Sequence, residues 1–596
     1  MITWSLSTNL PTFADDRGKA DGLMRSTGKP WEHLIGSTPL GVLVWKSENH
    51  PNLPGIISSL WLQPLQDLVK PWRWIRIHGL ALPEGTHWAL AQGLNGWTDS
   101  PLIQKNQFIS PENNPKQRPF GDADLYEPNA RPGTCHAWSW TIFGGPNAKN
   151  AFAGALYDHN CWSLFEIDLN HRSLTLALDI DGLRASTLPI GESGRCLGKW
   201  IFPTEQSLGE SSAPLTEWFD AWTGLLKESR PGFTTPRQLA DPIYGYTSWY
   251  YRYNRIDQEW LRANMHALPR NRWQIFQVDD GYQTKVGDWL RPSQGFPESI
   301  APVLSEAKEL GFQPGIWTAP FVALENSQCA YEHSDWFLRN DKGERILCGD
   351  FPHWGGKFFA LDTENPAFLD HLTDVLATYF KKWGCQFLKA DFLYASGKIA
   401  SGHLTRAQRA YRSQRWLFQT CQRFGAQLLT CGPYMPSAYG LTDFCRIGPD
   451  VFTAWEIPDQ LHFQSREKCS TRASIVNTLT RSCLDNRVWH NDPDVFILRQ
   501  TPDVKLNSQE KLALAKANHL FGSLIFCSDY LHEYGPWEHE YLEILQKSAA
   551  PKRLGSQIES LSTNQNGSWH IRCRNSLHYE MIWTQGKPEL LTSPNP

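Results

Sequence analysis

The sequence has no C-x-x-C pair, although it contains 13 cysteines. Their number is odd and most of them sit inside apolar segments, so we expect neither a complete disulfide framework nor a structural zinc site. Unpaired cysteines favour a reducing compartment. Residues 1–10 also lack the basic stretch and long apolar run of a secretory leader. We therefore predict a cytoplasmic protein.

Long hydrophobic runs are absent as well. No stretch approaches the roughly 18 apolar residues that a membrane helix needs. The formal net charge is only −4 over 596 residues, with no basic stripe for nucleic acid and no acidic block typical of disorder. We therefore expect neither a membrane nor a nucleic acid as a partner, and the sequence carries no signal for an oligomeric state.

Tryptophan, by contrast, is abundant, with 28 residues. Most of these rings must pack in cores and between domains. A few can stack on sugar rings, whose C–H faces pack well on aromatic planes.

The pattern of apolar residues changes twice along the chain. Residues 1–235 contain short apolar or alternating runs, such as 40–45, 72–77, 137–143 and 173–178, which predict a β-sandwich; a helical stretch at 214–229 begins a linker. Residues 236–545 alternate strands with helices and predict a (β/α)8 TIM barrel. Residues 546–596 alternate again and predict a small C-terminal β domain. The expected fold is thus multidomain.

The barrel prediction rests on eight strands and the helical patterns between them. The strands are predicted at 243–249, 273–278, 313–317, 387–389, 427–430, 444–447, 488–489 and 523–526. The helical patterns include 301–310, 366–383, 405–424 and 508–520.

Acidic residues follow three of these strands directly, in 276–281, 387–391 and 445–450. In a (β/α)8 barrel the carboxyl ends of the strands form the catalytic face. Two carboxylates at a suitable separation are enough to cleave a glycosidic bond. The sequence therefore points to glycoside chemistry.

Asp391 is the first of these candidates. Lys389 lies two residues earlier, so on an ideal strand both side chains point to the same face. A nearby ammonium lowers the pKa of a carboxyl group and keeps it ionised, as a glycosidase nucleophile must be. The alternative is a structural ion pair.

Asp450 ends the stretch Arg446-Ile-Gly-Pro-Asp450, in a turn just past a strand. It is a candidate general acid/base, a role that needs a pKa raised by burial or by a neighbouring carboxylate. The alternative is an Asp that caps the next helix.

Asp279 and Asp280 follow the second strand. Neighbouring residues of a strand face opposite ways, so we expect only one of the two to point at a ligand, where a carboxylate can accept hydrogen bonds from vicinal sugar hydroxyls. A metal site is disfavoured because the barrel region has no H-x-H and no clear histidine cluster.

Trp317, Trp249 and Trp455 could wall a sugar pocket or pack inside the barrel. Cys431, in Thr430-Cys-Gly-Pro433, also ends a strand. A nucleophilic cysteine needs a positioned histidine, and none is evident nearby, so a pocket-lining or packing thiol is expected.

Seven segments between residues 242 and 530 resemble, in order and spacing, glycoside hydrolase family 36, the α-galactosidases, especially the compact bacterial and thermophilic members. The segments are 247–250, 278–282, 287–290, 315–321, 389–393, 446–450 and 491–494.

The resemblance implies a retaining mechanism with Asp391 as the nucleophile and Asp450 as the acid/base. It implies a terminal-sugar pocket lined by Asp279, Asp280, Trp317, Lys389, Cys431 and Arg446. It also implies a small carbohydrate substrate and no metal or organic cofactor.

Two departures from the family stand out. Many members carry Trp between the Lys and the nucleophile, where this chain has Ala390. The segment 348–356 is expected to contact substrate, but its His353 and glycine pair match no version of the family pattern. This leaves the exact sugar open.

The alternatives to an exo-acting α-galactosidase are therefore an α-N-acetylgalactosaminidase or other α-glycosidase, a transglycosylase of the raffinose-synthase kind, and a catalytically silent carbohydrate-binding barrel. Retention of both Asp391 and Asp450 argues against the silent barrel.

Overall fold

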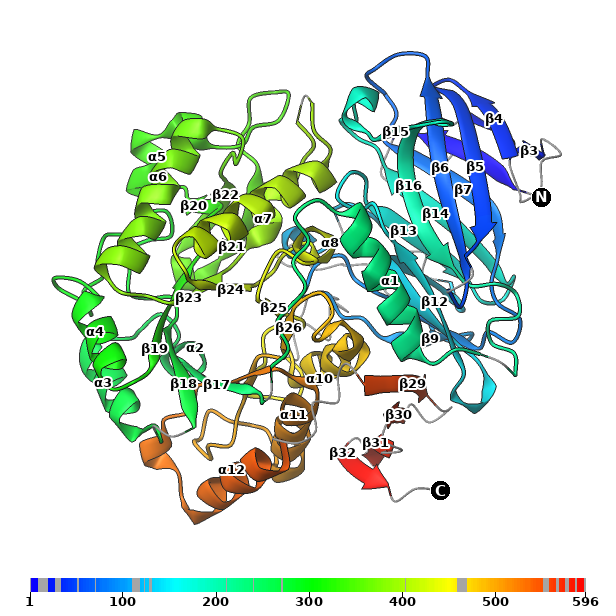
Figure 1. The fold of residues 1–596 in the computed structure, drawn as a ribbon. Helices are drawn as coiled ribbons and strands as arrows, with labels where there is room; N and C mark the ends of the chain where they lie inside the picture. The colour runs from blue at the N-terminus through cyan, green and yellow to red at the C-terminus, as the bar shows by residue number, and fades with distance from the viewer. Residues whose placement is uncertain are drawn as a thin grey trace.

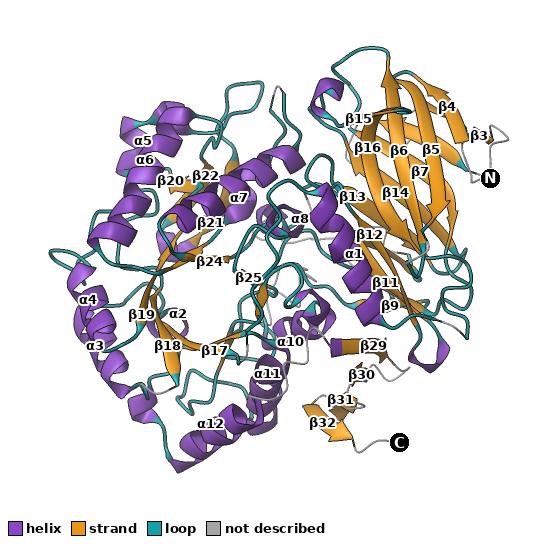
Figure 2. Ribbon diagram, viewed as in Figure 1, coloured by secondary structure: helices purple, strands orange, loops and turns teal. Residues whose placement is uncertain are grey.

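The computed structural model describes residues 2–593 except 9–19, 27–33, 51–52, 70, 110–117, 123, 128–130, 211, 240, 270–271, 402, 458–468, 550–556, 564–567, 574–577 and 585–586. These residues form two N-terminal antiparallel sheets, a central ring of parallel strands with helices outside it, and a small C-terminal antiparallel sheet (Figure 1, Figure 2). The predicted fold class is confirmed. The boundaries at residues 235 and 545 stay predictions, and helix α12 (Pro536–Ala549) runs across the second.

The N-terminal part consists of two antiparallel sheets. The first has the order β10-β13-β14-β7-β1-β2 and the second β3-β4-β5-β6-β16-β12-β11-β8-β9, with β15 beside β16. Their strands are β1 Thr3–Ser7, β2 Ala20–Leu23, β3 Arg25–Ser26, β4 Leu34–Thr38, β5 Gly41–Asn49, β6 Ile56–Pro64, β7 Trp74–Ala81, β8 Trp88–Leu90, β9 Leu102–Gln104, β10 Thr134–Trp138, β11 Trp140–Gly144, β12 Asn150–Ala155, β13 Ser163–Asp168, β14 Ser173–Asp179, β15 Ile190–Gly191 and β16 Gly194–Phe202.

The two sheets pack face to face through large aromatic side chains. Phe165 of the first sheet contacts Phe202 of the second, with ring centroids 5.9 Å apart. Trp200 stacks on Trp45 at 5.8 Å and donates its indole N–H to Ser163 Oγ across the interface at 2.9 Å. Apolar faces buried in this way supply the main stabilisation of a sandwich.

The central ring has the parallel strand order β26-β25-β24-β23-β19-β18-β17-β28-β27. Ser523 N donates to Asn491 O of β26 at 2.9 Å, which joins the start of β28 to the far end of the sheet. The strands are β17 Ile243–Thr247, β18 Trp273–Val278, β19 Gln313–Thr318, β23 Phe387–Ala390, β24 Gln427–Thr430, β25 Phe444–Arg446, β26 His490–Asp492, β27 Val495–Phe496 and β28 Leu524–Cys527.

The predicted strand at 488–489 is wrong. These residues lie in a turn in which the N–H of Asn486 donates a hydrogen bond to Trp489 O, and the strand begins at His490. It is then interrupted at Pro493, which has no N–H to donate, and at Asp494, whose φ of 77° leaves the β region. The first strand also ends earlier than predicted, because Trp249 opens a short helix, α2 (Trp249–Arg252).

Several helices around the ring begin at side-chain caps. Thr405 forms a capping box with Gln408 at the start of α7 (Arg406–Arg423), and Asn507 forms one with Glu510 at the start of α11 (Ser508–Phe521). Other helices around the ring are α3 Gln258–Ala267, α4 Ala301–Glu309, α5 Gln328–Glu332, α6 Pro366–Ala377, α8 Met435–Ala438 and α10 Thr471–Thr480. The predicted helical stretches coincide with α4, α6, α7 and α11.

Helix α1 (Leu215–Ser229) joins the sandwich to the ring, as Figure 1 shows. Trp222 donates to Ala155 O of β12 at 2.8 Å, and its ring meets Tyr439 at 5.3 Å. The C-terminal sheet (β29 Ile558–Thr563, β30 Trp569–Cys573, β31 His578–Thr584, β32 Lys587–Ser593) is tied to the sandwich by two hydrogen bonds of 2.9 Å between Asn150 and Leu561. Within the described ranges, no helix is both long and apolar enough to cross a membrane.

Candidate active site

A cavity of about 260 Å³ lies at the carboxyl ends of the ring strands. The ring supplies most of its wall, a hairpin inserted after β19 supplies another part, and the N-terminal region supplies the rest. The lining residues are Trp97, Phe120, Trp249, Asp279, Asp280, Trp317, Asp350, Phe351, Pro352, Trp354, Lys389, Asp391, Phe392, Pro449, Asp450 and Cys469. A larger hollow of about 830 Å³ beside α1 contains none of the strand-end acids, so we place the site in the smaller cavity.

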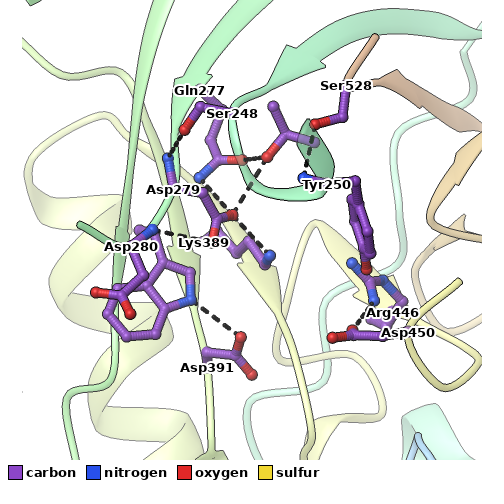
Figure 3. A network of polar contacts seen from close by, with 12 residues as sticks. Ser248, Tyr250, Gln277, Asp279, Asp280, Lys389, Asp391, Arg446, Asp450 and Ser528 are labelled. Atoms are coloured by element: carbon purple, nitrogen blue, oxygen red, sulfur yellow. Dashed lines mark hydrogen bonds and ion pairs between the residues drawn. The ribbon is translucent and has the colours of Figure 1, made fainter. Parts of the chain in front are cut away.

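Lys389 and Asp279 form a buried ion pair at the cavity. Lys389 Nζ lies 2.8 Å from Asp279 Oδ2, which also accepts from Gln277 Nε2 at 3.1 Å and Thr247 Oγ1 at 3.2 Å. The alternative reading, a structural ion pair between Lys389 and Asp391, is therefore wrong, because Lys389 pairs with Asp279 instead. Lys389 reaches across β19 to the end of β18, and Figure 3 shows the ammonium beside Asp279.

Asp280 lines the cavity together with Asp279, so the expectation that only one of them faces the ligand is also wrong. The strand has already ended at Val278, and Gly281 (φ 116°) turns the chain, so strand alternation no longer applies. Trp354 Nε1 donates to Asp280 Oδ2 at 2.7 Å. Burial raises the pKa of Asp280 to about 6, while the hydrogen bond from Trp354 lowers it.

Asp391 is held in a fixed orientation immediately after β23. Its Oδ2 accepts the indole N–H of Trp317 at 3.0 Å, and its Oδ1 accepts the N–H of Phe392 at 2.8 Å. Burial raises the pKa of Asp391, and the charge of Lys389 opposes that rise without overcoming it. The expected net lowering of this pKa is thus not found, because desolvation is the larger effect.

Asp450 lies next to Arg446 at the end of β25, with 2.9 Å between Arg446 Nη1 and Asp450 Oδ1. Its side chain is 37% exposed, whereas that of Arg446 is 2% exposed. In Figure 3, Asp450 sits with Arg446 and Tyr250, while Asp391 belongs to the neighbouring group around Lys389. A carboxyl that faces the cavity while hydrogen-bonded to one fixed partner can exchange a proton with a bound substrate.

The other predicted site residues fall into two groups. Trp317 and Trp249 line the cavity. Cys431 and Arg446 lie behind it: Cys431 hydrogen-bonds Asp391, and burial raises the pKa of its thiol. Trp455 is not among the described residues that line the cavity; its half-buried ring packs against the apolar core.

The N-terminal region contributes two aromatic rings that the sequence reasoning missed. Trp97 packs against Phe392 with ring centroids 5.2 Å apart, and Phe120 lies 6.4 Å from Trp97. Gly432 has a φ of 58°, and a Cβ there would come within 2.4 Å of the Trp97 ring. The absence of a side chain at Gly432 therefore makes room for Trp97 of the N-terminal region.

The hairpin of β21 (Leu347–Phe351) and β22 (Gly356–Ala360) closes another side of the cavity. Asp350, Phe351, Pro352 and Trp354 line the cavity, so the expectation that 348–356 contacts a ligand agrees with the geometry. The Trp354 ring packs on Phe392 at 4.7 Å.

No cluster of three or more side chains suited to hold a metal ion occurs among the residues that the structure describes. The cavity presents carboxylates, one ammonium and several aromatic faces. Carboxylates and flat aromatic rings side by side suit a sugar, whose hydroxyls donate and whose C–H faces stack.

Residues 248–425 match the family model described as Melibiase. Among curated proteins, an α-galactosidase of Escherichia coli is 33% identical over 110 residues, which cover 17% of this chain and 15% of that protein. Alpha-galactosidase 2 of Pediococcus pentosaceus is 25% identical over 151 residues, or 24% of this chain and 20% of that protein. The alignments thus span about a fifth or less of the length of these curated relatives.

Similarity to solved structures extends over most of the chain. TtGalA, an α-galactosidase from Thermus thermophilus solved with p-nitrophenyl α-D-galactopyranoside, is 23% identical, with a TM-score of 0.65 over 90% of this chain and 97% of that one. A doubly substituted variant of the α-galactosidase AgaA from Geobacillus stearothermophilus, solved with raffinose, is 12% identical, with a TM-score of 0.56 over 93% and 76% of the two chains. These matches confirm the three-part fold.

Proposed function

Because residues 248–425 of this chain belong to the melibiase family, we propose that the protein is a retaining, exo-acting α-galactosidase. The observation that carries the proposal is that Asp391 and Asp450, which follow different strands of the ring, face one cavity together with the Asp279–Lys389 pair. A catalytically silent binding protein would need hydrogen-bonding groups, but it would not need two carboxyls with distinct partners.

In the proposed reaction the carboxylate of Asp391 attacks the anomeric carbon while Asp450 gives its proton to the leaving oxygen. The bond between the anomeric carbon and the aglycone breaks, and a glycosyl ester of Asp391 forms. Asp450 then takes a proton from water, the water oxygen attacks the same carbon, and the ester bond to Asp391 breaks. Two inversions retain the anomeric configuration.

Each neighbour of Asp391 has a part in this scheme. Trp317 N–H and Phe392 N–H each occupy one carboxylate oxygen, which fixes the plane of the attacking group. Lys389, whose charge the partner Asp279 holds in place, favours the ionised form of Asp391 against the effect of burial. No metal or organic cofactor enters the scheme.

The size of the cavity supports an exo-acting enzyme. About 260 Å³ lies below the roughly 300–1,000 Å³ that drug-sized ligands occupy, which suits a single terminal sugar ring. TtGalA has been solved with stachyose, and the AgaA variant with raffinose, so α-galactosyl oligosaccharides are the substrates we propose here as well. All thirteen cysteines are free thiols, which favours the cytoplasm as the compartment.

Hydrolysis of a panel of p-nitrophenyl glycosides tests the proposal. We expect turnover of the α-galactoside, little turnover of the α-glucoside and α-N-acetylgalactosaminide, and none of the β-galactoside. Preference for another α-glycoside would keep the mechanism and reassign the sugar. If none of the four is hydrolysed and no α-galactosyl oligosaccharide is cleaved, the proposal is wrong.

A further inference from the structure

Arg446 contacts three carboxylates, of which only one faces the cavity. Its Nη1 lies 2.9 Å from Asp450 Oδ1, its Nη2 lies 2.7 Å from Asp494 Oδ1 and its Nε lies 3.3 Å from Asp492 Oδ2. The side chains of Asp492 and Asp494 are 0% and 1% exposed. A single guanidinium therefore serves three acids, two of them fully buried.

Asp494 is also tied to the backbone next to Asp450. Its Oδ2 accepts the N–H of Val451 at 2.9 Å and the hydroxyl of Tyr250. Asp494 itself has a left-handed backbone (φ 77°), an unusual conformation for a residue other than glycine. Such a conformation persists where surrounding contacts enforce it, often at functional sites.

We propose that Asp494 is a positioning residue for Asp450: it anchors the turn that carries Asp450 and offsets the guanidinium charge that would otherwise keep Asp450 ionised. This rests on the proposed function, in which Asp450 must hold a proton before it acts on the leaving group. Asp494 itself touches no substrate, since it does not line the cavity.

The charges around Arg446 carry the electrostatic part of the proposal. Arg446 carries one positive charge and contacts three carboxyl groups, so ionising all three would leave two negative charges uncompensated. Like charges at close range disfavour joint ionisation, and such a pair keeps one proton over an extended pH range. In agreement, burial, together with the charges of Asp450 and Asp492, raises the pKa of Asp494 to about 7 against the opposing charge of Arg446.

The other titratable groups that act on Asp450 or Asp494 are Tyr250, Tyr253, Asp391, Cys431 and Cys469. Burial raises the pKa of the tyrosines and of both thiols. These four groups stay neutral while the pair of acids titrates. Asp391 titrates as well, but it is the same in every variant compared, so a difference between variants reports on the pair.

The test is the pH dependence of kcat/KM for an alkyl α-galactoside, whose poor leaving group needs acid assistance. Asp494→Asn keeps the shape of the side chain and suits a left-handed backbone. It removes one of the two acids that share the last proton, so the alkaline limb should move to lower pH by about one unit or more. Tyr250→Phe removes a hydrogen bond that favours ionised Asp494, so its alkaline limb should move to higher pH.

Asp179→Asn serves as the matched control. Asp179 is a buried carboxylate in β14 that accepts Arg406 Nε at 2.8 Å and Nη2 at 3.1 Å, away from the cavity. It should lower stability without moving either limb. Opposite shifts of the two site variants are not expected from a purely structural role.

An Asp494→Asn protein that is active with an unmoved alkaline limb would overturn the proposal. If that variant does not fold, an unmoved limb in Tyr250→Phe overturns it instead. If the wild-type protein hydrolyses no α-glycoside, the proposed function fails, and the pair is then tested without turnover. Infrared titration of the protonated carboxyl band should show that Asp450→Asn and Asp494→Asn each alter one common transition; two independent transitions would contradict the pair.

Discussion

Trp354 donates its indole N–H to Asp280 Oδ2 at 2.7 Å, and this bond ties the β21–β22 hairpin to the end of β18. Asp280 is buried, and its other oxygen accepts the N–H of Gly281 at 2.8 Å. The hairpin is thereby held against the cavity by a bond to a group that we expect to bind the sugar.

Replacing Trp354 by Phe should weaken substrate binding. The ring is kept but the donor to a charged group is lost, and such a bond contributes about 1.5–3 kcal/mol, or roughly 10–100-fold in KM. The pKa of Asp280 is about 6 with the donor present and should rise without it. As the pH is lowered, Asp280 should therefore become protonated, and the KM should increase, at a higher pH in the variant than in the wild type.

The matched control is Trp61→Phe, which removes an indole N–H that donates to Ser59 Oγ at 2.8 Å in the N-terminal sheet. Steady-state kinetics at pH values on both sides of the Asp280 pKa compare the two. Equal KM values for Trp354→Phe and wild type across this range would contradict the role given to the hairpin.

Replacing Asp450 by Ala should separate substrates by their leaving groups. An alkyl α-galactoside needs a proton on its leaving oxygen, and general acid catalysis contributes about 10²–10⁴-fold, so its glycosylation rate should fall by that factor. A p-nitrophenyl galactoside leaves without protonation and should lose far less in the same step. Pre-steady-state kinetics measure the rate of the glycosylation step directly. Equal losses of this rate for both substrates would argue against a general acid at this position.

Replacing Lys389 by Met should lower both the stability of the protein and its activity. Asp279 would remain as a buried carboxylate without its cation, and breaking a buried pair in this way costs about 3–5 kcal/mol. The double variant Lys389→Met/Asp279→Asn should recover part of that loss. Denaturant unfolding of the three proteins checks this, and a double variant less stable than either single variant would contradict the pairing.

Replacing Gly432 by Ala should displace Trp97 and raise the KM, because the added Cβ comes within 2.4 Å of that ring. Gly425→Ala is the control, since Gly425 is also left-handed (φ 70°) but has open space at its Cβ. Both variants should lose about 1–2 kcal/mol of stability through backbone strain. Only Gly432→Ala should change the KM. A similar change of KM in both variants would contradict a role of Trp97 in substrate binding.

The sequence predicted the strand-end acids well because each depends on a local pattern, an apolar strand followed by a polar turn. Asp391 and Asp450 therefore fall at the cavity as expected. The partner of Lys389 was not predictable in this way. Lys389 meets Asp279 across an intervening strand, and that contact depends on the curvature of the ring rather than on spacing within one strand.

The aromatic walls of the cavity could not be predicted from the sequence, for a different reason. Trp97 belongs to the N-terminal region, and nothing near it in sequence marks it among 28 tryptophans. Its place is set by packing between domains, notably against Gly432. Asp494 was part of a recognised segment, but its importance appears only when Arg446 is seen to hold three acids at once.

In the proposed reaction Asp391 forms a covalent bond to the sugar. Incubation with a fluorinated α-galactosyl fluoride, which forms the glycosyl ester but releases it slowly, followed by proteolysis and mass spectrometry, tests it most directly. We expect one added sugar mass on the peptide that contains Asp391, and none in Asp391→Asn. A label on another residue, or full turnover by Asp391→Asn, would contradict it.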